Sequence, residues 1–198
     1  MPASKSRIRA DMRRQRRQLT DSQQRRAGDD LARQIARRDF FLRSRRLAFY
    51  LPNDGEIDPG MLMSVALAAG KRVYLPKLDP FRHNRLHFLR YLPDEPLRAN
   101  RYGIPEPRLG RYRAAPLWSL DIIFLPLVAF DGRGQRLGMG GGYYDRSLAP
   151  LARSPRRGPL LIGLAHHFQE TDALPAEPWD IPLHAIATDR GLIHCPGA

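Results

Sequence analysis

From residue 121 onward the chain passes from an almost continuous apolar run into a glycine-rich loop, and this order limits the folds open to it. Residues 121–130 are nearly all apolar, which predicts a buried β-strand. Four of the five residues 138–142 are glycine, and residues 143–149 have the character of the first turns of a helix. At the start of a helix, free backbone N–H groups and the helix dipole favour an anion such as phosphate. Taken alone, the loop is equally open to interpretation as a plain glycine-rich turn.

Strand and helix patterns alternate along the rest of the chain. Thr20-Asp-Ser-Gln23 has the form of a capping box, and Ala27, Leu31 and Ile35 predict the inner face of the helix that it opens. This alternation predicts a single α/β domain over residues 1–198, with a mainly parallel sheet flanked by helices. The expected strands are 46–51, 71–76, 86–92, 121–130, 160–165 and 184–188; the expected helices are 4–19, one from Thr20, 59–69 and 143–152.

Positive charge is concentrated near the N-terminus. The chain carries a formal net charge of +13, and residues 1–46 hold 15 Lys and Arg against 5 Asp. The basic helical part, residues 1–45, favours binding of phosphates, polyglutamates, nucleic acid or anionic membranes without choosing among them. Lys5 and Arg9 lie four positions apart and so share a helix face; taken alone, this spacing favours a solvated basic face over an anion site.

Several classes of protein lack support in the sequence. Cys195 is the only cysteine, which excludes an intrachain disulfide framework and fits a reducing cytoplasm. No apolar run approaches the ~18 residues that span a bilayer, so we expect a cytoplasmic protein without a membrane partner. The glycine loop matches neither the P-loop nor the dinucleotide-binding fingerprint, since no Gly-Lys-Ser/Thr follows it and Tyr143 stands where a third glycine is needed.

Two further segments have the character of loops. Residues 93–117 predict a long surface connection, and residues 194–198 predict a flexible tail.

A set of short motifs occurs in order along nearly the whole chain, and together they resemble one known family. The motifs are Lys5-x3-Arg9, Tyr50-Leu-Pro-x-x-Gly-Glu56, Gly103-Ile-Pro-Glu-Pro107, the run 121–130, Arg136-Leu-Gly-Met-Gly-Gly-Gly-Tyr-Tyr-Asp-Arg146 and Trp179-Asp180. The chain resembles the 5-formyltetrahydrofolate cyclo-ligases, also called methenyltetrahydrofolate synthetases. The long glycine motif is highly specific, whereas the others carry weight only jointly.

The resemblance implies a reaction and its cofactors. Members of the family convert 5-formyltetrahydrofolate to 5,10-methenyltetrahydrofolate, while ATP becomes ADP and phosphate and Mg2+ is required. The formyl oxygen is phosphorylated, N10 closes onto the activated carbon, and phosphate leaves. Such phosphoryl transfer depends mostly on positioning and charge neutralisation, which agrees with a site without a catalytic cysteine or serine.

The resemblance also assigns roles to residues of this chain. The carboxylate of Glu56 suits the donor-rich pterin, and the rings of Tyr143 and Tyr144 can pack on a flat ligand or in the core. Catalytic roles fall to Arg136, Tyr143 and Arg146, and the metal-linked acids are Asp145 and Asp180. ATP maps to Lys5, Arg9, Arg136, Leu137, Gly138, Met139, Gly140, Gly141, Gly142, Tyr143 and Tyr144; the folate maps to Leu51, Glu56, Met139, Gly140, Gly141, Gly142 and Tyr143.

Two departures from the family pattern keep alternatives open. Some members have a lysine where this chain has Gly141, and many have an acid where it has His184. A folate-binding relative without turnover is therefore one alternative. A nucleic-acid-binding protein that uses basic residues 1–46 is the other, although no nucleic-acid motif supports it. We expect a monomer that acts on a small-molecule folate, with or without a polyglutamate tail.

Overall fold

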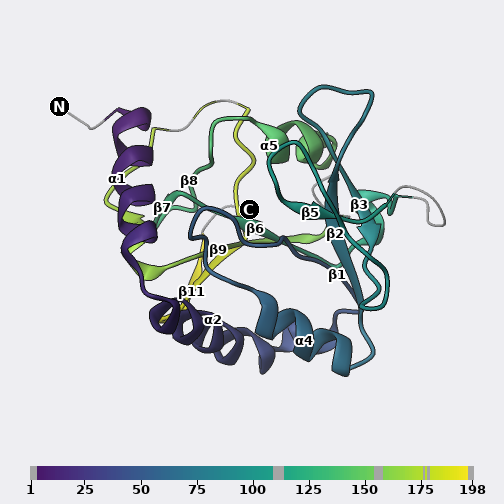
Figure 1. Ribbon diagram of the computed structural model, residues 1–198. Helices are drawn as coiled ribbons and strands as arrows, with labels where there is room; N and C mark the ends of the chain where they lie inside the picture. The colour runs from purple at the N-terminus through teal and green to yellow at the C-terminus, as the bar shows by residue number, and fades with distance from the viewer. Residues whose placement is uncertain (1–3, 109–113, 154–157, 176, 178, 196–198) are drawn as a thin grey trace.

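A seven-stranded, mainly parallel sheet forms the centre of the molecule, as predicted. Figure 1 shows the computed structural model, which describes residues 4–108, 114–153, 158–175, 177 and 179–195. The strand order is β12-β11-β9-β6-β1-β2-β3. The five inner strands run parallel, and the two edge strands β12 and β3 pair antiparallel with their neighbours. The strands are β1 (Arg46–Ala48), β2 (Arg72–Leu78), β3 (Leu86–Arg90), β6 (Ile122–Pro126), β9 (Leu160–Ala165), β11 (Ala185–Thr188) and β12 (Leu192–His194).

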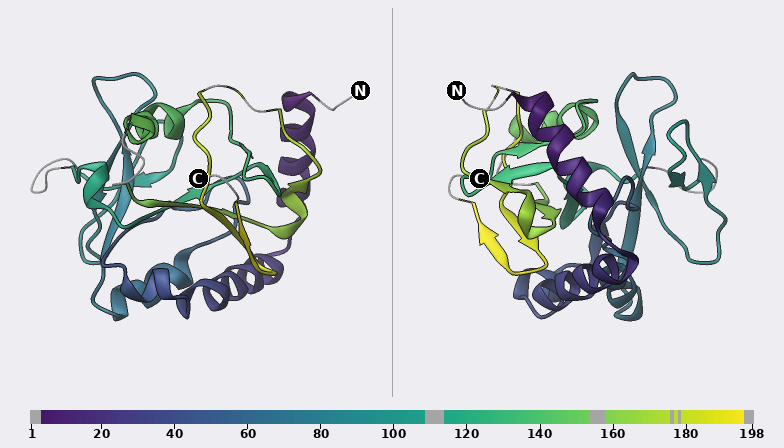
Figure 2. Two further views of the ribbon diagram at one scale, coloured as in Figure 1. Left: turned by 180° about the vertical axis from the view of Figure 1, so that it is seen from behind. Right: turned by 60° about the vertical axis from the view of Figure 1, so that its left-hand side comes forward.

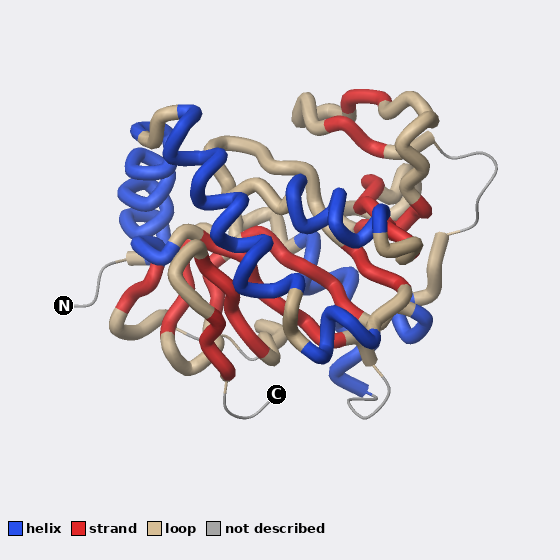
Figure 3. The backbone as a smooth tube through the Cα atoms, turned by 90° about the horizontal axis from the view of Figure 1, so that it is seen from below, coloured by secondary structure: helices blue, strands red, loops and turns tan. Residues whose placement is uncertain are grey.

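Helices cover both faces of this sheet. Helices α2 (Asp21–Ala36), α3 (Asp39–Arg43) and α4 (Gly60–Ala68) pack on one face, and α5 (Tyr143–Leu148) on the other (Figure 1). Seen from the side of α2 and α4, these helices cross in front of the strands (Figure 3). Leu31 and Ile35 of α2 are fully buried against that face, and Ala27 is buried beside them, as the sequence predicted. Burial of the apolar stripe supplies the main driving force for this packing.

Helix α1 (Lys5–Gln18) runs up the side of the molecule and carries the first cations of the chain (Figure 2). Ser4 caps it by accepting a hydrogen bond from Arg7 N. Ile8 and Met12 pack against a small cluster outside the main sheet, which includes Ala129 and Leu137. The capping box predicted at Thr20 is present at the start of α2, so the chain turns sharply between the two helices.

The single strand predicted over 121–130 is wrong, because the chain breaks out of the sheet within it. Strand β6 ends at Pro126, and β7 (Ala129–Asp131) belongs to a separate sheet with β8 (Arg136–Leu137) and β10 (Glu170–Thr171). The whole run reads as one apolar segment because both strands are buried. At the break, Gln169 Nε2 donates to Leu127 O at 2.7 Å and to Val128 O at 2.8 Å, so a buried side chain replaces the missing sheet partners.

Other boundaries also differ from the expectation. The connection 93–117 contains a short hairpin, β4 (Arg98–Ala99) with β5 (Pro105–Glu106), and its residues 109–113 lie outside the described residues. Pro59 is the N-cap of α4 instead of its first helical residue. His194 belongs to β12, and Cys195 N donates to His184 O at 3.1 Å, so the tail expected from residue 194 is ordered at these two positions. Short 3-10 helices are η1 (Leu117–Ser119), η2 (Ala149–Arg153) and η4 (His167–Gln169).

Candidate functional site

A pocket of about 630 Å³ lies at the carboxyl ends of the central parallel strands. Its walls come from the segments that follow β1 and β6, from β2, from α1 and from the β4–β5 hairpin. Ligands of open α/β sheets bind at this edge, because loops from several strands meet there. Every residue that the sequence assigned to the site lines the pocket except Arg146. The assigned lining residues are Lys5, Arg9, Leu51, Glu56, Arg136, Leu137, Gly138, Met139, Gly140, Gly141, Gly142, Tyr143, Tyr144, Asp145 and Asp180.

The glycine loop connects β8 to α5, so the strand before it is β8 and not the predicted apolar run. Gly140 has a φ of 95° and Gly142 a φ of 64°, both in the region that side chains disfavour. At Gly141 an added Cβ would lie 2.9 Å from the ring of Tyr143, so the tyrosine ring packs directly on the loop backbone. A lysine at this position would require Tyr143 to move.

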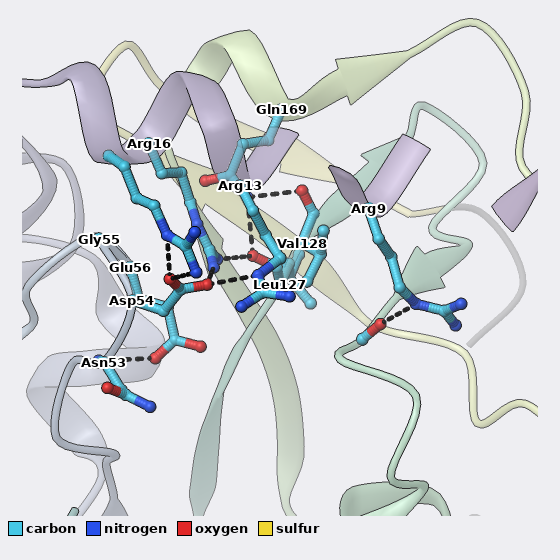
Figure 4. Close-up of polar contacts among 12 residues, drawn as sticks. Arg9, Arg13, Arg16, Asn53, Asp54, Gly55, Glu56, Leu127, Val128 and Gln169 are labelled. Carbon is cyan, nitrogen blue, oxygen red and sulfur yellow. Dashed lines mark hydrogen bonds and ion pairs between the residues drawn. The ribbon is translucent and has the colours of Figure 1, made fainter. Parts of the chain in front are cut away.

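Helix α1 brings two cations to the pocket, and both have partners within the protein. Lys5 Nζ donates to Glu177 Oε1 at 3.1 Å. Arg9 Nε donates to the carbonyl of Gly138 at 2.8 Å, which joins α1 to the glycine loop (Figure 4). The face predicted from the spacing of Lys5 and Arg9 therefore points at the site and not at bulk solvent.

Arg136 lies under the glycine loop with a donor to spare. Its side chain is only 6% exposed and pairs with the carboxylate of Asp145. Its Nε is buried and has no hydrogen-bond partner among the described residues. A buried donor without a partner is costly, so Arg136 holds one N–H group that no described residue satisfies.

Arg146 lies behind the loop instead of lining the pocket. Its Nη1 donates to Gly141 O at 2.7 Å, and Asn84 Nδ2 donates to the same carbonyl at 2.9 Å. The side chain therefore holds the shape of the loop from outside. A catalytic role for Arg146 would have to act through this contact.

The two predicted metal ligands are both present in the pocket but already have protein partners. Asp145 pairs with Arg136, and Asp180 Oδ2 accepts from Glu177 N at 2.9 Å. No group of three or more His, Cys, Asp or Glu that could hold a metal occurs within the described part of the chain. Mg2+ usually binds one or two carboxylates and takes its other ligands from water and phosphate, so this donor set suits it.

Glu56 lies at the end of the turn that follows β1. Burial raises its pKa from 4.5 to about 7, with a smaller contribution from nearby Asp54, while Arg16 acts in the opposite direction. Its Oε2 accepts from Asn53 N at 3.1 Å. Near neutral pH this carboxyl can therefore carry a proton and donate, or lose it and accept.

At the rim, Tyr143 joins the glycine loop to the β4–β5 hairpin. Its hydroxyl lies 2.7 Å from that of Tyr102 and accepts a hydrogen bond from Arg101. Burial raises the pKa of Tyr143, and it raises the pKa of Tyr144 further. The sequence reasoning quoted the motif 103–107 but missed Arg101 and Tyr102, which directly precede it.

Sequence reasoning also missed Arg16 and Asp54, which meet beside the pocket (Figure 4). Arg16 is fully buried and pairs with Asp54. A signal for Arg16 was present, because Ile8, Met12 and Arg16 follow one another at intervals of four and therefore lie along one helix stripe. An arginine on an apolar stripe indicates a buried partner.

A model of the 5-formyltetrahydrofolate cyclo-ligase family matches residues 1–189. The chain belongs to this family. It is 42% identical over 179 residues to the 5-formyltetrahydrofolate cyclo-ligase of Haemophilus influenzae. The aligned region covers 90% of this chain and 94% of that protein. With the Escherichia coli K12 protein of the same name it shares 43% identity over 177 residues, 89% of this chain and 96% of the relative.

Solved structures agree with the family. The NMR structure of the Aquifex aeolicus 5,10-methenyltetrahydrofolate synthetase has a TM-score of 0.81 and 31% identity, and the match covers 98% of this chain and 94% of that one. A Mycoplasma pneumoniae 5,10-methenyltetrahydrofolate synthetase, 23% identical with a TM-score of 0.73, supports the fold. The chain is therefore a ligase of a folate one-carbon family. Among the described residues, no helix is long and apolar enough to cross a membrane.

Proposed function

We propose that the pocket converts 5-formyltetrahydrofolate to 5,10-methenyltetrahydrofolate with ATP and Mg2+. The observation that carries this proposal is the meeting of Lys5, Arg9, the glycine loop and Glu56 in one pocket of a chain that belongs to this family. Cations and glycine N–H groups suit phosphates, whereas a partly apolar wall with one carboxyl suits a pterin. We further propose that the protein acts as a cytoplasmic monomer.

The chemistry balances without a covalent bond to the protein. The formyl oxygen attacks the γ-phosphorus of ATP, and ADP leaves. N10 then attacks the activated formyl carbon, its proton is released, and phosphate departs with the former formyl oxygen. A formyl oxygen is a poor leaving group, and the phosphate ester supplies the missing driving force. The protein needs to align the two substrates and to neutralise phosphate charge.

Each part of the pocket has a role in this scheme. Lys5, Arg9 and the free Nε of Arg136 would neutralise the phosphates, together with N–H groups of the loop. Arg136 and Tyr143 would touch the reacting groups, and Arg146 would act by holding Gly141. The folate would lie against Leu51 and the loop residues 139–143, with Tyr144 behind them.

Glu56 and the two aspartates complete the pocket. The carboxyl of Glu56 would hydrogen-bond the pterin. Asp145 and Asp180 would hold Mg2+ beside the phosphates. When bound, Mg2+ supplies charge neutralisation to the transferring phosphoryl group.

The arginine-rich N-terminus has a role within this proposal. Arg9 contacts the loop, and Arg13, Arg16 and Arg17 all pair with Asp54. Four arginines of α1 are therefore turned toward the protein. This arrangement favours a structural and substrate-binding use of the helix over nucleic-acid binding.

A spectrophotometric assay tests the proposed function. Purified protein mixed with 5-formyltetrahydrofolate, ATP and Mg2+ should develop methenyl absorbance, and leaving out ATP or chelating Mg2+ should prevent it. ADP should form in equal amount with the methenyl product. Folded protein that binds folate without forming product would instead support the relative without turnover. RNA binding that falls steeply with salt, together with an inactive pocket, would support the nucleic-acid alternative.

A further inference from the structure

One carboxylate, that of Asp54, receives three guanidinium groups from a single helix. Its Oδ2 accepts from Arg13 Nε at 2.6 Å and from Arg16 Nη2 at 3.1 Å, and its Oδ1 accepts from Arg17 Nε at 2.5 Å (Figure 4). Partial burial raises the pKa of Asp54, but hydrogen bonds from Arg13 and Arg17 and the positive charges of Arg13 and Arg16 bring it below its usual range. Both oxygens already accept hydrogen bonds from arginines, and Asp54 also lines the pocket.

The turn that carries Asp54 also carries Glu56. Asp54 has a φ of 52° and Gly55 a φ of 72°, and Glu56 N donates to Asn53 O at 3.1 Å, as in a type I′ turn. A non-glycine residue at positive φ is strained, and it keeps that conformation only where its surroundings hold it there. The three arginines of α1 supply that restraint.

Backbone contacts press the same turn against α1. An added Cβ at Gly55 would lie 3.0 Å from the backbone of Arg16, so only glycine allows this approach. Gln24 Nε2 donates to Gly55 O at 3.0 Å, and the imidazole Nε2 of His166 lies 3.3 Å from the same carbonyl. The turn is thus clamped by α1 and by its surroundings.

The ion pairs of Asp54 with Arg13, Arg16 and Arg17 form a clamp between α1 and the turn. Buried Arg16 extends this clamp to the break between β6 and β7. Its Nη1 donates to Leu127 O at 3.3 Å, the carbonyl that Gln169 also satisfies. Helix α1, the turn and this break therefore meet around one fully buried guanidinium. The substrate-facing residues of α1, Lys5 and Arg9, lie on the same helix, one to three turns before the clamp.

We propose that Asp54 is a positioning residue that locks α1 to the turn 53–56 and so sets Lys5 and Arg9 opposite Glu56. The inference rests on the proposed function, because it assumes that α1 serves the nucleotide and Glu56 the folate. In this proposal Asp54 acts through α1 and the turn and not by contact with a substrate. When these ion pairs break, Lys5 and Arg9 on α1 and Glu56 on the turn are no longer held in fixed positions relative to one another.

Asp54→Asn tests the clamp, because it removes the negative charge and replaces one acceptor oxygen by an NH2 donor that cannot bond to a guanidinium. Asparagine tolerates positive φ and keeps the size of the side chain, so the turn can still form. A pocket that is competent for only a fraction of the time binds each ligand more weakly by that same fraction, and a first ligand restores the affinity for the second. We expect the Kd values of ATP and 5-formyltetrahydrofolate each to rise about tenfold.

The decisive measurement is the recovery of affinity. With a saturating non-hydrolysable ATP analogue, the folate Kd of Asp54→Asn should return to within about twofold of the wild-type value. The kcat at saturation of both substrates should also approach the wild-type value. A change in only one Kd, or equal weakening without recovery, would overturn the proposal.

Asp11→Asn is the matched control. Asp11 also pairs with arginines of α1, accepting from Arg14 Nη2 at 2.8 Å, but this pair lies on the outer surface of the helix. The control should leave both Kd values and the kcat unchanged. If it weakens binding as much as Asp54→Asn, general loss of charge on α1 and not the clamp is responsible.

Failure of the proposed function can be told apart from failure of the clamp. If the wild-type protein makes no product, the proposed function fails, and the binding titrations still judge Asp54. If the wild-type protein binds neither ligand, the rates of amide hydrogen exchange test the clamp instead. Faster exchange across 5–18 and 53–56 in Asp54→Asn, but not in Asp11→Asn, supports the clamp. Unchanged exchange in both segments overturns it.

Discussion

The glycine loop 138–142 and the turn 53–56 both line the pocket, yet they are held in different ways. Arg146, four residues after Gly142, holds the loop by donating to Gly141 O, and Arg9 and Asn84 add contacts from farther away. The turn depends on three arginines from α1, some 40 residues earlier in the chain. Glycine residues largely set the shape of the loop, whereas the turn is held by ion pairs of Asp54, of which the pair with Arg16 is the buried one. Two neighbouring parts of one pocket can therefore be disrupted by different kinds of substitution.

Breaking the turn's buried ion pair should have the largest effect on stability. Arg16→Met keeps most of the side-chain volume but leaves Leu127 O with one partner fewer and Asp54 with less positive charge. We expect the free energy of unfolding in urea to fall by about 3 kcal/mol, because one partner of a buried pair is lost. Arg14→Met, at an exposed pair of the same helix, should change it by less than about 0.5 kcal/mol. Equal effects would show that burial of Arg16 is not what matters.

The turn also carries Glu56, whose raised pKa should make the stability of the protein depend on pH. Its pKa rises from 4.5 in the unfolded chain to about 7 in the fold, so the folded state holds the proton more tightly. Its contribution to stability is present below pH 4.5 and is lost as pH rises to 7. Glu56→Gln should therefore become more stable relative to wild type between pH 5 and pH 8, by up to about 3 kcal/mol. Glu170→Gln, at an exposed carboxylate, should show no such trend in the same urea titrations.

The glycine loop should respond to backbone conformation instead of charge. Gly142→Ala places a side chain at a φ of 64°, where its Cβ would lie 2.8 Å from Arg146 Nη1. Gly70→Ala meets a similar φ of 69° with nothing within 4 Å, so it reports the conformational strain alone. We expect a loss of about 1 kcal/mol for Gly70→Ala and more for Gly142→Ala, by thermal or urea unfolding. Equal losses of stability in the two variants would show that the Arg146 side chain moves aside without an energetic cost.

The smallest effect is expected where α1 reaches the pocket without burial. Lys5→Ala removes a partly exposed contact to Glu177, so stability should hardly change. The KM for ATP should rise about fivefold, which corresponds to roughly 1 kcal/mol, with kcat nearly unchanged. Steady-state kinetics at saturating folate measure it. An unchanged KM would return Lys5 to the solvated-face interpretation.

Much of the site was visible in the sequence because its residues are local in the chain. The residues 136–145 form one continuous motif, and the capping box at Thr20 needs only four residues. The break after Pro126 was missed because both β6 and β7 are buried, and hydrophobicity alone does not distinguish one buried strand from two. Arg101 and Tyr102 were missed because their contact with Tyr143 joins residues about 40 positions apart.

The amino-acid sequence was enough to establish the α/β class, the family resemblance, the glycine loop and the cationic face of α1. Periodicity and local motifs encode these features directly, since neighbouring residues specify them. The fold was needed to show that Asp54 pairs with Arg13, Arg16 and Arg17, and that Arg146 lies behind the loop. Those contacts depend on which faces the sheet and helices bury against one another. Burial turns ordinary surface charges into a clamp, because a guanidinium removed from water requires a partner.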